Sequence, residues 1–186
     1  MKTGTTTKIL LAAALLAGTA LAAGKDSIAQ PATDDAIAKQ VRHAVLTYPY
    51  YSLWDQVELF VHDGQVRLNG AVTQPVKKAD LGKRVARIPG VTGVANEIRV
   101  LPLSPMDDRL RWQVAHAIFG ESPLERYAAG ALPAIHIIVD NGHVTLSGVV
   151  STDGDKNLAG IRARGAGLSF GDVVNNLEVE HPSKKS

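Results

Sequence analysis

A hairpin-like segment occurs twice in this chain, as VELFVHDGQVRLNG at Val57–Gly70 and as IHIIVDNGHVTLSG at Ile135–Gly148. In both copies, apolar residues alternate with other residues on either side of a two-residue turn. The turn dipeptides Asp63-Gly64 and Asn141-Gly142 favour a type I′ turn, which requires positive φ at both central residues. The repeat predicts two copies of one small α/β unit.

The turn length also fixes which residues of each hairpin face one another. A slip of one residue would move every large aliphatic side chain to the opposite face of the sheet, so the register is strongly specified. The predicted pairs are Val57 with Gly70, Leu59 with Leu68, Val61 with Val66, Ile135 with Gly148, Ile137 with Leu146, and Val139 with Val144.

Helical patterns precede both hairpins. An acidic pair, Asp34-Asp35 or Asp107-Asp108, suits the N-terminus of a helix through capping and the helix dipole. Apolar residues at helical spacing follow each pair. These stripes are Ile37, Val41, Ala44 and Val45 in the first unit, and Leu110, Val114, Ala117 and Ile118 in the second.

A second helix and a closing strand are predicted after each hairpin. The first of these helices starts near Pro75 and ends before Pro89-Gly90, and its counterpart, Asp155–Arg164, has a weaker pattern interrupted by Gly160. The closing strands are Val94–Leu101 and Val173–Glu180. The predicted fold is therefore α+β: two tandem αββαβ units, each a three-stranded mixed sheet with two helices on one face.

The N-terminal residues are typical of a secretory signal peptide. Lys2 and Lys8 flank a short charged region, an apolar run covers Ile9–Ala17, and Ala20-Leu21-Ala22 fits a cleavage site. We therefore expect export to the periplasm. The expected segments are a signal peptide at 1–22, a flexible N-terminal segment at 23–33, a first domain at 34–101, a Pro-rich linker at 102–106, a second domain at 107–180 and a C-terminal tail at 181–186.

The chain has no cysteine, which excludes disulfides, thiolate catalysis and an anchor on a lipidated cysteine. Without Lys2 and Lys8, the expected mature chain balances its basic and acidic residues. It therefore has no global basic excess for nucleic acid, which we do not expect as a partner.

Several recurring motifs resemble the BON domain (bacterial OsmY and nodulation). They are the acidic helix start, the hairpin segments Val61–Gly70 and Val139–Gly148, and a V-x-N-x-[IL]-x-V strand at Val94–Val100 and Val173–Val179. Two such domains would cover Asp34–Glu180. The resemblance implies a non-enzymatic periplasmic or envelope-attached protein that binds phospholipid and supports envelope integrity.

Side chains that could support catalysis do not converge in the sequence. His43 and His116 lie off the apolar helix stripes, and the spacing around His136 and His143 does not indicate a metal site. We predict no catalytic residue, no metal and no cofactor.

A basic run marks the second helix of the first unit, and its charges are expected to face outward because Leu81, Val85 and Ile88 face inward. Such a helix can lie on anionic headgroups or can simply be solvated. The candidate residues for lipid or anion binding are Lys77, Lys78, Lys83, Arg84 and Arg87.

Aromatic and aliphatic residues supply two further groups of candidates. Tyr50, Tyr51 and Trp54 suit a membrane interface, a protein partner or partial burial over the end of a small core, and Trp112 suits packing between the units or contact with a headgroup.

Phe60 and Ile138 occupy matching positions on the outward sheet faces, where they serve either an inter-unit contact or a partner. The leading hypothesis is an exported protein that binds phospholipid surfaces in envelope integrity or stress response. A protein-interaction or chaperone-like periplasmic module is the alternative, and a structural homo-oligomer is a third.

Overall fold

The computed structural model describes residues 33–120, 122–130, 132–166 and 171–180, which belong to one compact unit. The expected signal peptide, the N-terminal segment up to residue 32 and the C-terminal tail lie outside the described residues.

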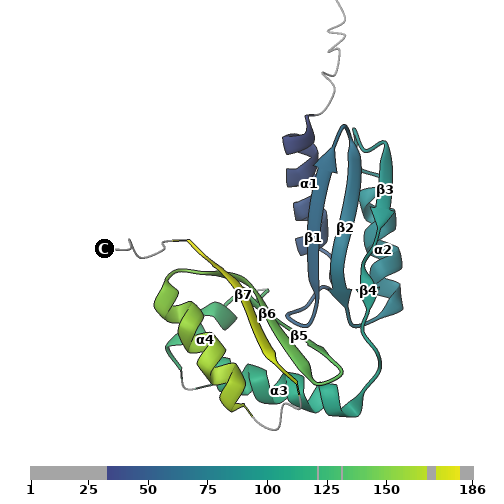
Figure 1. Ribbon diagram of the computed structural model, residues 1–186. Coiled ribbons are helices and arrows are strands. Elements are labelled where there is room, and N and C mark those ends of the chain that lie inside the picture. Colours follow the sequence, from purple (N-terminus) through teal and green to yellow (C-terminus); the bar gives the residue numbers. More distant parts are fainter. Residues whose placement is uncertain (1–32, 121, 131, 167–170, 181–186) are drawn as a thin grey trace, which may run out of the picture. The chain divides into compact units, whose positions relative to one another are not determined.

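Two repeats of the same element order make up the described chain (Figure 1). The first contains α1 (Asp34–Leu46), β1 (Gln56–His62), β2 (Gln65–Val72), α2 (Pro75–Val85), β3 (Gly93–Asn96) and β4 (Arg99–Val100). The second contains α3 (Pro105–Phe119), the short 3-10 helix η1 (Pro123–Ala128), β5 (Ile135–Asp140), β6 (His143–Val150), α4 (Asp153–Gly165) and β7 (Val173–Val179). The α+β prediction with tandem units is confirmed.

The central strand of each sheet is the second strand of the hairpin. β2 pairs antiparallel with β1 and parallel with β3 and β4. The predicted closing strand is therefore divided into β3 and β4, with a break at Glu97 and Ile98. In the second repeat, β6 pairs antiparallel with β5 and parallel with β7. All six predicted cross-strand pairs are confirmed, and the turn residues Asp63, Gly64, Asn141 and Gly142 have positive φ.

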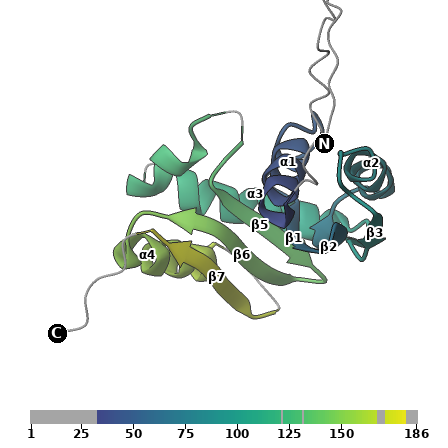
Figure 2. The ribbon, with the colours of Figure 1, turned by 90° about the horizontal axis from the view of Figure 1, so that it is seen from above.

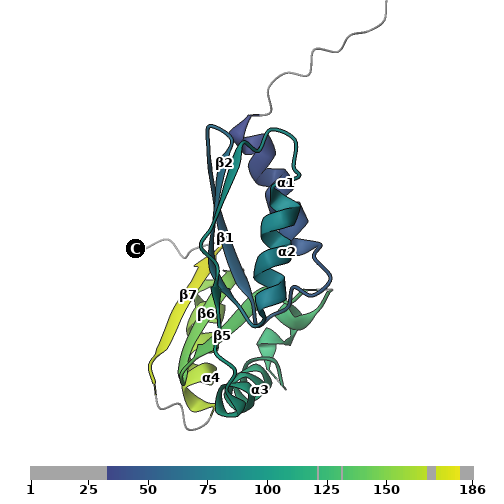
Figure 3. The ribbon, with the colours of Figure 1, turned by 90° about the vertical axis from the view of Figure 1, so that its right-hand side faces the viewer.

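Both helices of a repeat cover the same face of its sheet. Figure 3 shows α1 and α2 on one face of the first sheet, and Figure 2 shows α4 against the second. Inward-facing hairpin residues such as Leu68 and Leu146 pack with helix residues such as Val41 and Val114, and all four are fully buried. Each repeat therefore has its own hydrophobic core, as the alternating pattern predicted.

The acidic helix starts have a different role from the capping expected of them. Thr33 and Ser104 cap the helices instead. Asp34 accepts hydrogen bonds from the backbone N–H groups of Asp63 and Gly64, at 2.8 and 2.9 Å. Asp107 accepts from Asn141 and Gly142 in the same way, at 3.0 and 2.9 Å. In both repeats a helix carboxylate thus holds the hairpin turn.

Polar and apolar contacts join the two repeats. The Leu53 carbonyl accepts a 2.8 Å hydrogen bond from Ile137 N on the outer edge of β5. Ala71, Leu101 and Ile138 form a small buried cluster, and an Arg99–Asp140 ion pair lies at 2.9 Å. Among the described residues, no helix combines the length and apolarity that crossing a bilayer requires.

Candidate functional site

The basic residues of α2 divide into one buried lysine and several cations at the surface. Lys77 is only 5% exposed, so the expectation that its charge faces outward is wrong. It lies four and eight residues before Leu81 and Val85, which places it on the buried stripe of the helix. Lys83 and Arg87 are exposed, whereas Lys78 and Arg84 are half-buried.

Lys77 neutralises Asp55, a fully buried carboxylate in the loop before β1. Its Nζ lies 2.6 Å from Asp55 Oδ2, and Asp55 also accepts hydrogen bonds from the main chain and hydroxyl of Ser52 and of Thr73. A buried charge is tolerated only with such pairing. Lys77 therefore holds the loop in place and does not present a free charge to a ligand.

One of the surface cations, Arg84, adjoins the tyrosines that follow α1. The Arg84 guanidinium lies 5.7 Å above the Tyr48 ring, and Tyr48 packs edge-on to Tyr50 at 5.7 Å between ring centroids. Tyr50 is exposed, whereas the exposed Leu46 belongs to the lining of the groove described below. We call this surface the α2 patch and define it as Tyr50 together with Lys83, Arg84 and Arg87, which lie within the last turns of α2 and directly after it.

Tyr48 ties the α2 patch to the core of the first repeat. Its hydroxyl donates a 3.0 Å hydrogen bond to Asp80 on α2, and its side chain is buried. Burial, together with this hydrogen bond, raises the pKa of Tyr48 to about 12. The neutral Tyr48 hydroxyl therefore holds the Asp80 side chain in place on α2. Of the two neighbouring tyrosines, Tyr50 is the one whose ring is exposed.

The other aromatic candidates lie where the repeats meet. Tyr51 accepts a hydrogen bond from Val57 N, and its ring lies 5.6 Å from that of His136. Trp54 packs against the second core and edge-on to Trp112, with ring centroids 5.2 Å apart. Trp112 remains 67% exposed despite this contact. Of the four aromatic candidates, only Tyr50 belongs to the α2 patch.

Phe60 and Ile138, which match in sequence, differ in environment. Ile138 is 5% exposed because Ala71 and Leu101 of the first repeat cover it. Phe60 is 59% exposed, with Arg67 opposite it across the hairpin. Ile138 thus lies in the contact between the repeats, and Phe60 remains accessible to a partner.

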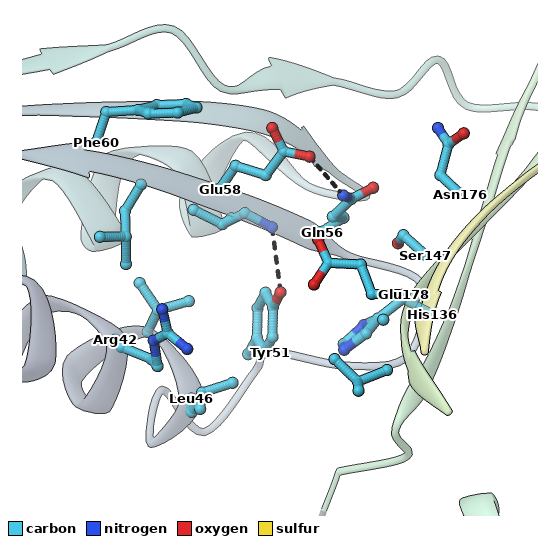
Figure 4. A pocket seen from close by; sticks show the side chains of 15 residues that line it. Arg42, Leu46, Tyr51, Gln56, Glu58, Phe60, His136, Ser147, Asn176 and Glu178 are labelled. Atoms are coloured by element: carbon cyan, nitrogen blue, oxygen red, sulfur yellow. Dashed lines mark hydrogen bonds between the residues drawn. The ribbon is translucent and has the colours of Figure 1, made fainter. Parts of the chain in front are cut away.

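A groove of about 710 Å³ opens between β1 and the outward face of the second sheet (Figure 4). Arg42, Glu58 and Phe60 line it from the first repeat, and His136, Ser147 and Glu178 line it from the second. We did not predict this site from the sequence. Alternation does place the second set on the outward face, but only the packing of the repeats brings the two sets together.

The residues with the geometry of a metal site lie at the first hairpin turn. Asp34, His62 and Asp63 place ligand atoms within 4.8 Å of one another. Both Asp34 oxygens already accept the turn N–H groups of Gly64 and Asp63, and these bonds lower the pKa of Asp34. The hydrogen bonds to the hairpin turn therefore account for the Asp34 carboxylate at this position.

Comparison with known proteins places the chain in a family. The model of the BON domain matches residues 33–102 and 125–181. No curated protein matches the chain.

The solved structures that resemble it include CdsD, a structural protein of the type III secretion system of Chlamydia trachomatis. That likeness has 14% identity and a TM-score of 0.28, and it covers 80% of this chain and 93% of the other. The C-terminal domain of CdsD gives 15% identity and a TM-score of 0.28, with 77% and 96% covered. Likeness at this level adds nothing to the assignment. The two matched segments, each of which contains one hairpin, the helix after it and the closing strand region, show that the chain belongs to the BON domain family.

Proposed function

We propose that this protein binds phospholipid surfaces reversibly through the α2 patch. The family supports this proposal, because BON domains are in general non-enzymatic modules for membrane, phospholipid or protein binding. The observation that carries it is the position of Arg84 over the Tyr48 ring, which brings the cations at the end of α2 close to the exposed Tyr50.

The chemistry of the patch matches an anionic membrane surface. Each Lys or Arg near such a surface contributes about 1 kcal/mol, and a tyrosine ring favours the boundary between apolar and wet regions. The contribution of charge is screened within about 10 Å at 0.1 M salt. We therefore expect attachment that depends on anionic lipid and weakens with salt.

Vesicle co-sedimentation tests this proposal. We expect Lys83→Glu with Arg87→Glu to weaken binding to anionic vesicles by roughly thirtyfold or more, because about 2 kcal/mol of attraction is lost and replaced by repulsion. Both side chains are exposed, so folding should be retained.

Arg162→Glu with Arg164→Glu is the matched control, because it makes the same charge change in the last turn of α4. It should bind like the original protein. Equal binding to neutral and anionic vesicles, or equal losses in both double variants, would contradict the proposal.

Location and biological role extend this proposal. BON-domain proteins are often periplasmic or envelope-associated, and the signal-peptide pattern at 1–22 agrees with that location. We propose a role in envelope integrity or stress response, where reversible attachment to phospholipid would be used. Immunodetection in periplasmic and cytosolic fractions tests the location, and recovery only from the cytosol would refute it.

The exposure of Phe60 favours a second candidate function, a protein-interaction or chaperone-like module. Site-specific cross-linking from the first sheet face, with and without Phe60→Glu, tests it. An unchanged set of cross-linked partners in the variant would count against a role for this face.

A further inference from the structure

Two buried polar atoms in the groove have no partner among the described residues. They are His136 Nδ1 and Ser147 Oγ. His136 lies opposite Ser147 across the hairpin, and Ser147 lies opposite Asn176 of β7, so these three residues form a row across the sheet. Ser147 is only 3% exposed. Buried polar groups without a partner are costly, which makes this row a site for a ligand that supplies hydrogen bonds.

Within the part of the chain that the structure describes, His136 Nδ1 lacks a hydrogen-bond partner that a ligand could supply. Burial is the largest influence on the ring and lowers its pKa, which favours the neutral form. The main chain at Asp55 and Ser52 acts in the opposite direction and partly offsets this lowering of the pKa. In neutral imidazole one nitrogen donates and the other accepts, so Nδ1 can pair with a polar group that a ligand supplies.

The wall of the groove opposite this row is a free strand edge. β1 is at the edge of its sheet, and alternate residues of an antiparallel edge strand direct their N–H and C=O groups away from the sheet. Val57 is such a residue, because its N–H donates to the Tyr51 hydroxyl. Leu59, two residues along β1, points its main-chain groups in the same direction and also lines the groove.

Charge in the groove selects among extended peptides. Its titratable residues include two carboxylates, Glu58 and Glu178, against the single guanidinium of Arg42. Within the described part of the chain, neither Glu178 nor Arg42 forms an ion pair. A lysine or arginine side chain brings both N–H donors that Ser147 Oγ can accept and the charge that Glu178 complements.

We propose that the groove binds an extended peptide segment of a partner protein, which pairs with β1 at Leu59 and places a basic side chain over His136, Ser147 and Glu178. Main-chain pairing would give affinity and the polar row would give selectivity, as in other cases of strand addition. This inference is independent of lipid binding and specifies a partner class for the second candidate function.

Fluorescence anisotropy with a labelled peptide tests the proposal on the full chain. The probe alternates threonine and valine around one central lysine. A second peptide replaces that lysine with glutamate, and a third inserts proline beside it to remove main-chain pairing. We expect the lysine probe to bind and each altered peptide to bind at least about tenfold more weakly.

Protein variants locate the binding. Glu178→Lys should weaken binding about tenfold or more, whereas Glu180→Lys, the same change two residues along and outside the groove lining, should not. Ser147→Ala should weaken it about two- to tenfold, the range for one hydrogen bond. Circular dichroism of each variant establishes that it is folded.

Three outcomes would overturn the proposal. They are no binding at about 1 mM protein, equal binding of the proline-containing probe, and equal effects of Glu178→Lys and Glu180→Lys. Concentration-dependent self-association that Glu178→Lys abolishes would instead make a second copy of this chain the occupant. Because Phe60 also lines the groove, cross-linked partners that Phe60→Glu removes and Glu178→Lys retains would support the second candidate function and contradict this inference.

Discussion

At the residue scale, two charged side chains that stabilise the fold belong to sequence patterns that are also typical of ligand-binding sites. Lys77 belongs to a basic run, yet it is buried against Asp55. Asp107 belongs to an acidic pair, yet it is buried under a hairpin turn. Removing one partner of a buried ion pair costs about 3–5 kcal/mol, because the other charge is left unpaired. Loss of function in such variants would therefore reflect loss of folding.

His136 gives the fold a predictable dependence on pH. Its pKa in the folded protein lies below the ordinary value of 6.5 because burial disfavours the charged ring. The unfolded chain therefore binds this proton first, and stability should fall as the pH drops below about 6.5, by at most about 1.4 kcal/mol per pH unit.

Chemical denaturation of the protein and of His136→Gln across the range from about pH 5 to pH 8 measures this effect. The difference in stability between the two proteins should stay constant above pH 7 and shift in favour of the variant at acid pH. A constant difference across the whole range would show that His136 does not contribute to acid sensitivity.

At the element scale, the two repeats use the same contact between the second helix and the closing strand. Asn96 donates to the Lys78 carbonyl and accepts from Ile98 N, and Asn175 repeats both bonds with Lys156 and Leu177. A glycine of the helix faces each asparagine. Gly160, which weakens the helical pattern in the sequence, is therefore explained by close packing.

A helix-favouring substitution at this contact should be destabilising. A Cβ at residue 160 would lie 2.8 Å from Asn175 Nδ2, a side chain held by two hydrogen bonds. We expect Gly160→Ala to lower the free energy of unfolding by about 1–3 kcal/mol, the usual cost of overpacking.

Gly154→Ala in the same helix is the matched control, because its Cβ would only reach ordinary contact with Thr152. It should be neutral or stabilising by up to about 1 kcal/mol. Urea denaturation of both variants measures the difference, and equal behaviour of the two would show that the asparagine contact is not tight.

At the scale of the whole molecule, the contact between the repeats depends on few groups. They are the Leu53–Ile137 hydrogen bond, the cluster around Ile138, the Arg99–Asp140 ion pair and the packing of Trp54 with Trp112. Because each repeat has its own core, the repeats should be able to separate without unfolding. The groove, in contrast, requires both of them.

Ile138→Glu should open this contact and leave both hairpins folded. A carboxylate in the apolar cluster with Ala71 and Leu101 would be costly to bury, so the repeats should unfold in two separate transitions. Ile161→Glu, the same substitution at an exposed position on α4, is the control and should leave unfolding unchanged. Calorimetry distinguishes them, and identical single transitions for both variants would contradict the prediction.

The sequence by itself determined the local architecture of this protein. The two type I′ turns and the alternating aliphatic residues fixed both hairpin registers, because a slip would expose the whole apolar set. Helical spacing likewise located both helix pairs, and it could have identified Lys77 as buried, since that residue shares the stripe of Leu81 and Val85.

Only the tertiary structure decided which surfaces remain accessible. Phe60 and Ile138 have the same local pattern, but packing of the first repeat covers one and not the other. The α2 patch and the groove likewise combine residues far apart in the chain. Local periodicity reports which face of an element is apolar, whereas the neighbours of that face depend on contacts between elements that no local pattern encodes.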